Sequence, residues 1–215
     1  MLLLAIDTSG RQGGVTLARG TNALKVIESV PIVGGTFSSE LIPQISDLLK
    51  KHGCTPQQLE GLAANTGPGS FTGLRVGLTA VKGLAEVLHI PIAAVTSLEL
   101  LLAAAEMEDD AIAVLDAGRG EVYAAIQTNG KREELLLSAP EAAAMAQSRN
   151  LRLITADANT AAKFADARLI NYCSSEIAAR IGLRKLQAGD TIDVLALDAN
   201  YIRKSEAEYT QKMKK

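Results

Sequence analysis

The chain has 215 residues, of which 47% are hydrophobic, 21% charged and 3% aromatic, and its net charge is −2. This length suits one large domain or two small ones, with enough apolar residues for a core. The weak charge and the scarce aromatic residues provide no basic field and few stacking surfaces for nucleic acid. Apolar runs are shorter than the ~20 residues of a membrane span, and the apolar start is too short for a signal peptide, so we expect a cytoplasmic protein.

The first half of the chain changes from strand patterns to helical patterns. In order, we expect a buried strand at residues 2–6, a return strand at 15–18, a third strand at 23–32, a helix at 38–52, a short helix near 56–59 and a strand ending before Gly67. A turn that begins at Asp7 joins the first two strands. A hairpin followed by a third strand and a helix excludes a simple βαβ start.

The most informative stretch is Gly67-Pro68-Gly69-Ser70, which separates the apolar residues 61–64 from a helical pattern that ends near Leu88. This order predicts a strand, a tight turn and a helix whose first N–H groups can face an anion. Two interpretations stay open. The favoured one is a tight connection with Ser70 as the helix cap, and the other is phosphate binding by Gly67, Gly69 and Ser70. The spacing fits neither the dinucleotide fingerprint nor the P-loop.

The second half of the chain repeats the opening pattern of the first. After a strand at 92–95 and a helix from Ser97 to about residue 107, an apolar run again ends in Asp, small residues, Gly and Arg, here at Asp116. We expect further strands at 111–115, 121–127, 134–138 and 151–155, and helices at 140–147 and 174–187. The sequence therefore predicts an α/β protein of two duplicated ββ-β-α-β-α subdomains: residues 1–108, joined by 195–215, and residues 109–194.

Several motifs resemble those of one known family. They are residues 4–9, 67–77, 82–85, 90–91, 97–99, 116–117, 121–123, 201–203 and 206–208, which cover most of the chain in the family's order. The two hairpin-led halves look like the actin/hexokinase/Hsp70 fold, which is ribonuclease H-like. The motifs, above all Gly-Pro-Gly-Ser-Phe-Thr-Gly-Leu-Arg, resemble the TsaB (YeaZ) family. One departure is Phe37, where family members often have His before Ser.

The resemblance implies an accessory subunit, without catalytic residues of its own, that enables transfer of threonylcarbamoyl to adenosine in tRNA. The implied partners are the catalytic paralogue TsaD, the ATPase TsaE and, when the chain is alone, a second copy. Contact with tRNA is implied only through the complex. For the basic residues at the end of the chain, a solvated terminus is favoured over an RNA contact; these are Arg203, Lys204, Lys212, Lys214 and Lys215. The alternative function is an autonomous ATP-dependent phosphotransferase or ATPase of the same fold.

A nucleotide site is a further open question. In the wider fold, the resemblance implies that an Asp after the first strand holds hydrated Mg²⁺ while hairpin groups hold phosphates, and Asp7, Thr8 and Ser9 have suitable side chains. A local turn in which Asp7 accepts nearby N–H groups explains the same residues. The turn after Asp116 lacks a hydroxyl-bearing residue. One of the two phosphate clasps therefore looks weakened; we expect that the chain requires no cofactor, and binding of ATP with Mg²⁺ stays open.

The histidine content argues against a metal site. The resemblance implies that TsaD binds iron through two His residues on the helix after the Gly-rich segment, and Ser97 and Leu101 stand at those positions here. The two histidines of the chain, His52 and His89, are far apart and fall at predicted helix ends, where capping is the better interpretation. We expect no metal site, which also argues against a metallopeptidase.

Two predicted helices carry candidate partner surfaces. An apolar arc on the helix at 38–52 and a face of small residues on the helix after Ser70 supply Leu41, Ile42, Ile45, Leu49, Gly73, Gly77, Ala80 and Leu84. Glycine inside a helix costs ~1 kcal/mol relative to Ala, so a close neighbour is expected. Two compatible explanations stay open: packing on the adjacent helix of the same domain, and a self-complementary patch for a homodimer and for a heterodimer with TsaD.

Overall fold

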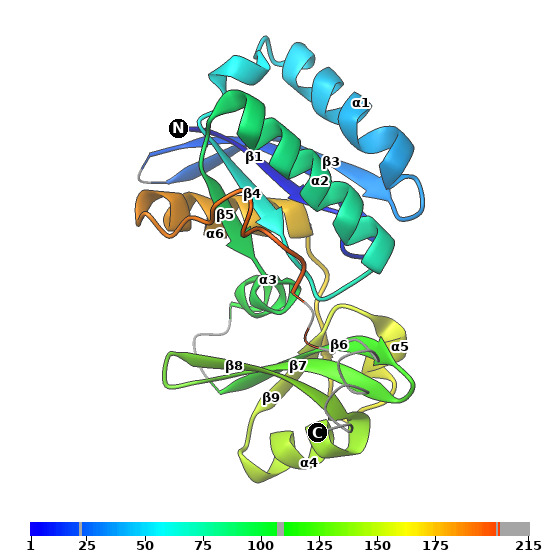
Figure 1. Ribbon diagram of the computed structural model, residues 1–215. Coiled ribbons are helices and arrows are strands. Elements are labelled where there is room, and N and C mark those ends of the chain that lie inside the picture. The colour runs from blue at the N-terminus through cyan, green and yellow to red at the C-terminus, as the bar shows by residue number, and fades with distance from the viewer. Residues whose placement is uncertain (22, 107–109, 201, 203–215) are drawn as a thin grey trace, which may run out of the picture.

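The computed structural model describes residues 1–21, 23–106, 110–200 and 202. Two lobes lie one above the other, and each contains a five-stranded sheet (Figure 1). The strand orders are β3-β2-β1-β4-β5 in the first lobe and β10-β9-β6-β7-β8 in the second. In both sheets, antiparallel strands that form two consecutive hairpins are extended by parallel strands. The duplicated α/β architecture predicted from the sequence is confirmed.

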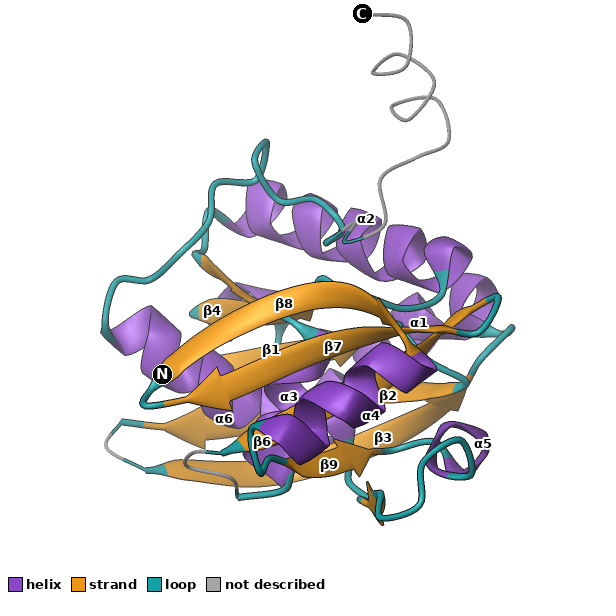
Figure 2. Ribbon diagram, turned by 90° about the horizontal axis from the view of Figure 1, so that it is seen from below, coloured by secondary structure: helices purple, strands orange, loops and turns teal. Residues whose placement is uncertain are grey.

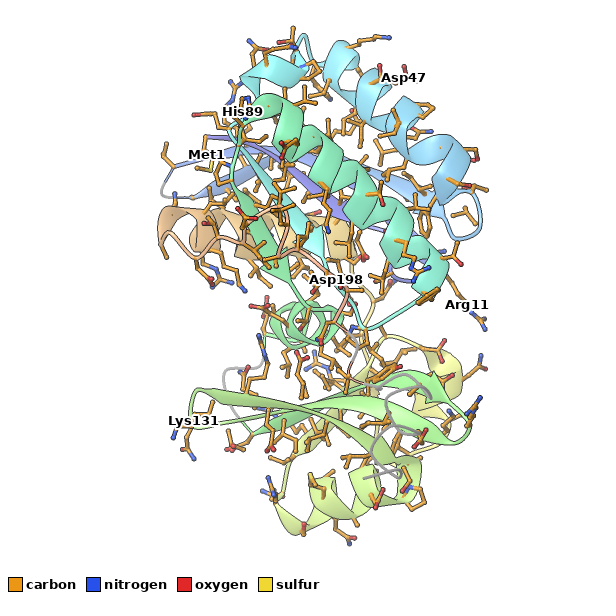
Figure 3. All side chains as sticks on the ribbon, viewed as in Figure 1. Met1, Arg11, Asp47, His89, Lys131 and Asp198 are labelled. Atoms are coloured by element: carbon orange, nitrogen blue, oxygen red, sulfur yellow. The ribbon has the colours of Figure 1, made fainter. Side chains whose placement is uncertain are left out.

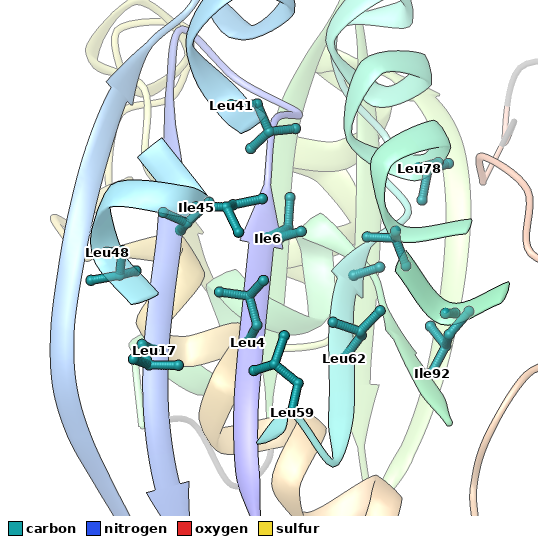
Figure 4. Close-up of a cluster of buried hydrophobic side chains, with 14 of the residues drawn as sticks. Leu4, Ile6, Leu17, Leu41, Ile45, Leu48, Leu59, Leu62, Leu78 and Ile92 are labelled. Carbon is teal, nitrogen blue, oxygen red and sulfur yellow. The ribbon is translucent and has the colours of Figure 1, made fainter. Parts of the chain in front are cut away.

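The first sheet is covered by helices on both faces. Its strands are β1 (Leu2–Asp7), β2 (Gln12–Gly20), β3 (Leu24–Val33), β4 (Gly61–Asn65) and β5 (Ile92–Val95). One face packs against α1 (Phe37–Lys51) and α2 (Phe71–Leu88), which lie side by side, and the short helix η1 (Pro56–Gln58) precedes β4. Every residue of β1 and β4 is buried, because strands in the middle of a two-sided sheet have no solvent face. The main core lies between this sheet and α1 and α2 (Figure 4).

The second lobe repeats this order with shorter helices. It contains β6 (Ala111–Gly118), β7 (Glu121–Thr128), β8 (Lys131–Ser138), α4 (Ala139–Ser148), β9 (Arg152–Thr155), α5 (Ala158–Ala161) and β10 (Arg168–Leu169). The view in Figure 2 shows α4 lying across this sheet, with β8 at its edge. The strand predicted at 134–138 begins earlier, at Lys131, since an edge strand accommodates charged residues.

Two helices cross the subdomain boundary predicted from the sequence. The helix α3 (Ser97–Ala104) lies between the lobes (Figure 1), with Leu98 and Leu101 in the core of the second lobe and Leu100 in that of the first. The helix α6 (Ser174–Gln187), which the sequence division assigned to residues 109–194, packs on the second face of the first sheet. The prediction is corrected here, because a helix at the end of one unit in the sequence can cover the sheet of the other.

The segment after α6 returns to the first lobe up to Asn200, which is the described part of the stretch expected to do so from about residue 195 onward. The Ile192 N–H donates to the Ile92 carbonyl at 2.9 Å, and Leu197 is fully buried in the first core. The basic residues at the end of the chain and the motif at 206–208 lie outside the described residues. Among the described residues, no helix is both long and apolar enough to cross a membrane.

Candidate functional site

A cleft of about 920 Å³ opens between the two lobes. The first lobe contributes the turn after β1 and the start of α2, including Asp7, Arg11 and Ser70. The second lobe contributes Asp116 and Asp157. Arg11 lies near the start of α2 at the side of the cleft (Figure 3). The cleft is the place where the sequence predicted a nucleotide contact, so its polar groups decide what it can hold.

The floor of the cleft is a buried hydrogen-bond network, which we call the Asp7–Asn65 network. Its members Asp7, Ser9, Asn65 and Ser97 are each at most 9% exposed. Asp7 Oδ1 accepts from the Ser9 N–H at 2.8 Å and from Asn65 Nδ2 at 2.9 Å. Asn65 Nδ2 also lies within 3.0 Å of the hydroxyls of Ser9 and Ser97.

The other side of Asn65 completes this network. Asn65 Oδ1 accepts from the Gly67 N–H at 2.9 Å and lies 3.1 Å from the Ser97 hydroxyl. Buried polar groups are stable only when paired, and the Asn65 amide, the Ser9 and Ser97 hydroxyls and Asp7 Oδ1 have their partners within the chain itself. The sequence had singled out Asp7 and Ser9, but Asn65 and Ser97 were missed as members. Their only sequence signal is position: Asn65 stands at the end of a buried strand, and Ser97 stands two residues after the next strand.

The glycine face of α2 packs against the turn after β1. A Cβ atom at Gly69, Gly73 or Gly77 would lie closer than 3.0 Å to Ser9 or Thr8, a separation that real Cβ atoms do not tolerate. At Gly69 and Gly73 the obstacle is a main-chain oxygen, and at Gly77 it is the Thr8 hydroxyl. Gly73 and Gly77, predicted for a partner interface, therefore contact the chain's own turn and are buried. This corrects the predicted position of that surface.

Two of the three residues predicted to bind an anion, Gly67 and Ser70, are hydrogen-bonded within the chain. The Ser70 N–H donates to the Ser9 carbonyl at 2.6 Å, and Ser70 Oγ accepts from the Gly73 N–H at 3.2 Å, so the predicted helix cap is confirmed. The Gly67 carbonyl accepts from the Ser97 N–H at 2.8 Å. Among the described residues no group of three or more His, Cys, Asp or Glu could hold a metal ion. The Ser70 N–H and the Ser70 hydroxyl therefore already have hydrogen-bond partners within the chain.

The carboxylate that the second lobe presents to the cleft, Asp116, already forms an ion pair within the chain. Lys163 Nζ lies 2.6 Å from Asp116 Oδ1. This hydrogen bond, assisted by the Gly118 N–H, holds the pKa of Asp116 below its ordinary value, although partial burial opposes the shift. Across the cleft, burial and, secondarily, the charge of Asp7 raise the pKa of Tyr172, so its phenol stays neutral. Asp116 therefore already has a partner in the chain, and the Tyr172 phenol remains uncharged.

The predicted partner surface divides into buried and exposed parts. Leu41, Ile45 and Leu49 belong to the core beneath α1 and are at most 4% exposed, while Ala80 and Leu84 are half-buried. Ile42 is 56% exposed, and Val87 of α2 is 76% exposed. Gly83, which sequence reasoning missed, is exposed, and a Cβ atom there would meet nothing within 4 Å. Among the glycines of α2, the one open to an outside contact is therefore Gly83.

The chain is similar in sequence to a known family model and to named relatives. A family model described as "TsaD: tRNA N6-adenosine threonylcarbamoyltransferase" matches residues 31–165, more than half of the chain. The chain is 37% identical over 139 residues to the tRNA threonylcarbamoyladenosine biosynthesis protein TsaB of Bacillus subtilis, covering 63% of this chain and 60% of that protein. The chain belongs to the TsaD and TsaB (YeaZ) family. It is also 32% identical over 126 residues to TsaB of Haemophilus influenzae, covering 57% of this chain and 52% of that protein.

Solved structures support the TsaB-like fold. YeaZ from Pseudomonas aeruginosa superposes with a TM-score of 0.72 at 24% identity, covering 93% of this chain and 99% of that chain. A second P. aeruginosa structure, of an uncharacterized protein with similarity to peptidase YEAZ, gives a TM-score of 0.74 at 23% identity and covers 94% and 99%. These structures therefore share the α/β fold of this chain, with its two five-stranded sheets. By sequence, the chain spans only 52 to 60% of the two curated TsaB relatives above.

Proposed function

We propose that the chain is a non-catalytic subunit in the addition of threonylcarbamoyl to adenosine in tRNA. In this proposal it pairs with the catalytic paralogue TsaD, works with the ATPase TsaE, and self-associates when alone. The names of its relatives, "tRNA threonylcarbamoyladenosine biosynthesis protein TsaB", support the process. The family model named for the transferase TsaD supports common ancestry with the proposed catalytic partner.

The observation that carries the non-catalytic role is the Asp7–Asn65 network. Its hydroxyl, amide and N–H groups bond to one another, so they are not free to bind a reacting group without breaking buried hydrogen bonds. The two positions that correspond to the iron ligands implied for TsaD also support a non-catalytic role. Ser97 is bonded within the network, and Leu101 is fully buried in the core of the second lobe.

The proposed pairing surface is the outer side of α1 and α2. These helices lie side by side on one face of the first sheet (Figure 1), and each carries an exposed apolar residue, Ile42 and Val87. Gly83 lets a helix of a partner approach α2 closely, because it has no side chain and a Cβ atom there would meet no atom of the described residues within 4 Å. We therefore move the predicted interface from the buried glycines Gly73 and Gly77 to Gly83 and its surroundings.

Analytical ultracentrifugation tests this surface, with the chain alone and mixed with TsaD of the same organism. Gly83→Arg places a long charged side chain in the open position and is expected to weaken both associations at least tenfold, which corresponds to about 1.4 kcal/mol. The matched control is Ala143→Arg on the exposed side of α4 in the second lobe. Associations as strong in Gly83→Arg as in the control would rule out this surface.

A further inference from the structure

One carboxylate of the second lobe reaches two separate segments of the first. Glu134 lies on β8, and its side chain is 18% exposed. Its Oε1 accepts a hydrogen bond from the Thr96 hydroxyl at 2.7 Å, and its Oε2 accepts one from Asn200 Nδ2 at 2.7 Å. Thr96 immediately precedes α3, and Asn200 lies in the segment that returns to the first lobe. A single side chain therefore joins three parts of the chain that are distant in sequence.

A set of charged side chains extends this contact. Arg132, two residues before Glu134, lies 3.8 Å from Glu134 and 3.4 Å from Glu99 of α3. Lys185 of α6 lies 3.5 Å from the same Glu99 oxygen and donates to the Ala94 carbonyl at 2.9 Å. The contacts thus run from β8 of the second lobe through α3 to α6 on the first sheet. The Glu99 side chain is 14% exposed, so these pairs are shielded better than ordinary surface pairs.

These contacts adjoin the floor of the cleft. Thr96 is followed by Ser97 of the Asp7–Asn65 network, and the Asn200 N–H donates to the carbonyl of Thr66, next to Asn65, at 2.7 Å. Movement of β8 away from the first lobe would break hydrogen bonds to a carboxylate, which are stronger than bonds between neutral groups. We infer that Glu134 is the central residue of an interlobe clasp that holds the cleft at a fixed opening. The members of the interlobe clasp are Thr96, Glu99, Arg132, Glu134, Lys185 and Asn200.

The competing explanation is that α3 alone fixes the lobes. Its leucines pack into the cores on both sides, with Leu98 and Leu101 toward the second lobe and Leu100 toward the first. Such contacts are non-directional and hold the helix in place without fixing the angle at which the edge of a sheet approaches. The hydrogen bonds of Glu134 act at that edge, in the middle of β8. The two explanations therefore predict different effects on the distance between the lobes when the Glu134 carboxylate is removed.

The test measures the distance between the lobes by pulsed electron paramagnetic resonance. Spin labels are placed at Asp47→Cys on the exposed side of α1 (Figure 3) and at Ala143→Cys on α4. The two native thiols are removed by Cys54→Ala and Cys173→Ser. Glu134→Ala is expected to widen the distance distribution at least twofold. The matched control is Glu133→Ala, which changes an exposed carboxylate on the same strand and should leave the distribution unchanged.

Hydrogen exchange supplies a second readout in the same variants. The Asn200 amide, bonded to the Thr66 carbonyl, should exchange at least tenfold faster in Glu134→Ala, whereas amides within α1 should keep their rates and so report an intact first lobe. An unchanged distance distribution together with unchanged exchange at Asn200 would overturn the clasp in favour of α3. If Glu134→Ala does not fold, Asn200→Ala decides, because it keeps the bond between Glu134 and Thr96. A wider distribution in Asn200→Ala supports the clasp, and an unchanged one overturns it.

Discussion

Two glycines of α2 give a matched pair for testing why the helix carries glycine. Gly83 is exposed and a Cβ atom there would meet no atom of the described residues within 4 Å, so Gly83→Ala adds a methyl group without a clash. The expected gain is about 1 kcal/mol, the difference in helix propensity between Gly and Ala. Gly73→Ala has the same gain in propensity, but its Cβ would meet the Thr8 carbonyl oxygen, and main chain at the end of β1 would have to move.

The magnitude follows from the cost of overpacking. Forcing an extra methyl group into a packed site costs typically ~1–3 kcal/mol, and the upper end applies here because the obstacle is main chain. After the gain in propensity, Gly73→Ala should lose about 2 kcal/mol, which leaves the two variants about 3 kcal/mol apart. For a chain of this length each kcal/mol shifts Tm by ~2–4 °C, so the Tm values should differ by roughly 6–12 °C.

Differential scanning calorimetry at a concentration where the chain is monomeric measures this difference. Dilution matters because Gly83 also lies on the proposed partner surface, and association would add to the apparent stability. Equal Tm shifts in the two variants, or a more stable Gly73→Ala, would refute the conclusion that α2 uses its first glycines to approach its own turn.

Three further changes probe single groups. Lys163→Met should lower stability at pH 7 by less than about 1 kcal/mol, since the pair is half-exposed. Because the pKa of Asp116 is lowered in the folded state, this difference should be present above about pH 4 and fade as the pH falls through the folded pKa; a constant difference in Tm from pH 3 to 7 would contradict it. His89 ends α2 with a φ of 53°, so His89→Gly should raise stability by up to about 1 kcal/mol in urea unfolding, and a loss would contradict the strain. With the pKa of Tyr172 raised, absorbance at 295 nm up to pH 11 should be the same in Tyr172→Phe and the unchanged protein, and a smaller rise in the variant would count against burial of that phenol.

Much of the fold could be predicted from patterns that are local in the sequence. The apolar run before Asp7, the glycines after it and the similar arrangement at Asp116 predicted two hairpin-led units. Helical spacing predicted α1 and α2 close to their observed bounds. These features succeeded because each is decided by residues a few positions apart. The packing of α6 on the first sheet depends largely on contacts with β1, β2 and β4, which lie more than one hundred positions away and which no local pattern reports.

The site was less predictable for the same reason. Glycines on one face of α2 required a close neighbour, but the sequence did not distinguish the chain's own turn at Thr8 from a partner helix. The link between Asn65 and Ser97 joins residues 32 positions apart and leaves no periodic trace. Glu134 read as one charge in a predicted strand, and only the fold brings it to Thr96 and Asn200. The sequence therefore predicted the types of residue at the cleft. It could not predict the hydrogen bonds that these residues already form with one another.

The most direct test of the central claim is tRNA modification with purified components and an Asp7→Asn variant of this chain. An Asn side-chain oxygen can still accept from the Ser9 N–H and from Asn65 Nδ2, so the variant removes the charge and one oxygen while retaining the network. Threonylcarbamoylation of adenosine by TsaD and TsaE should require this chain, and Asp7→Asn should support it within about twofold of the unchanged protein. A loss of tenfold or more with Asp7→Asn, while its binding to TsaD is intact, would contradict a non-catalytic role and favour an ATP-dependent activity of the chain itself.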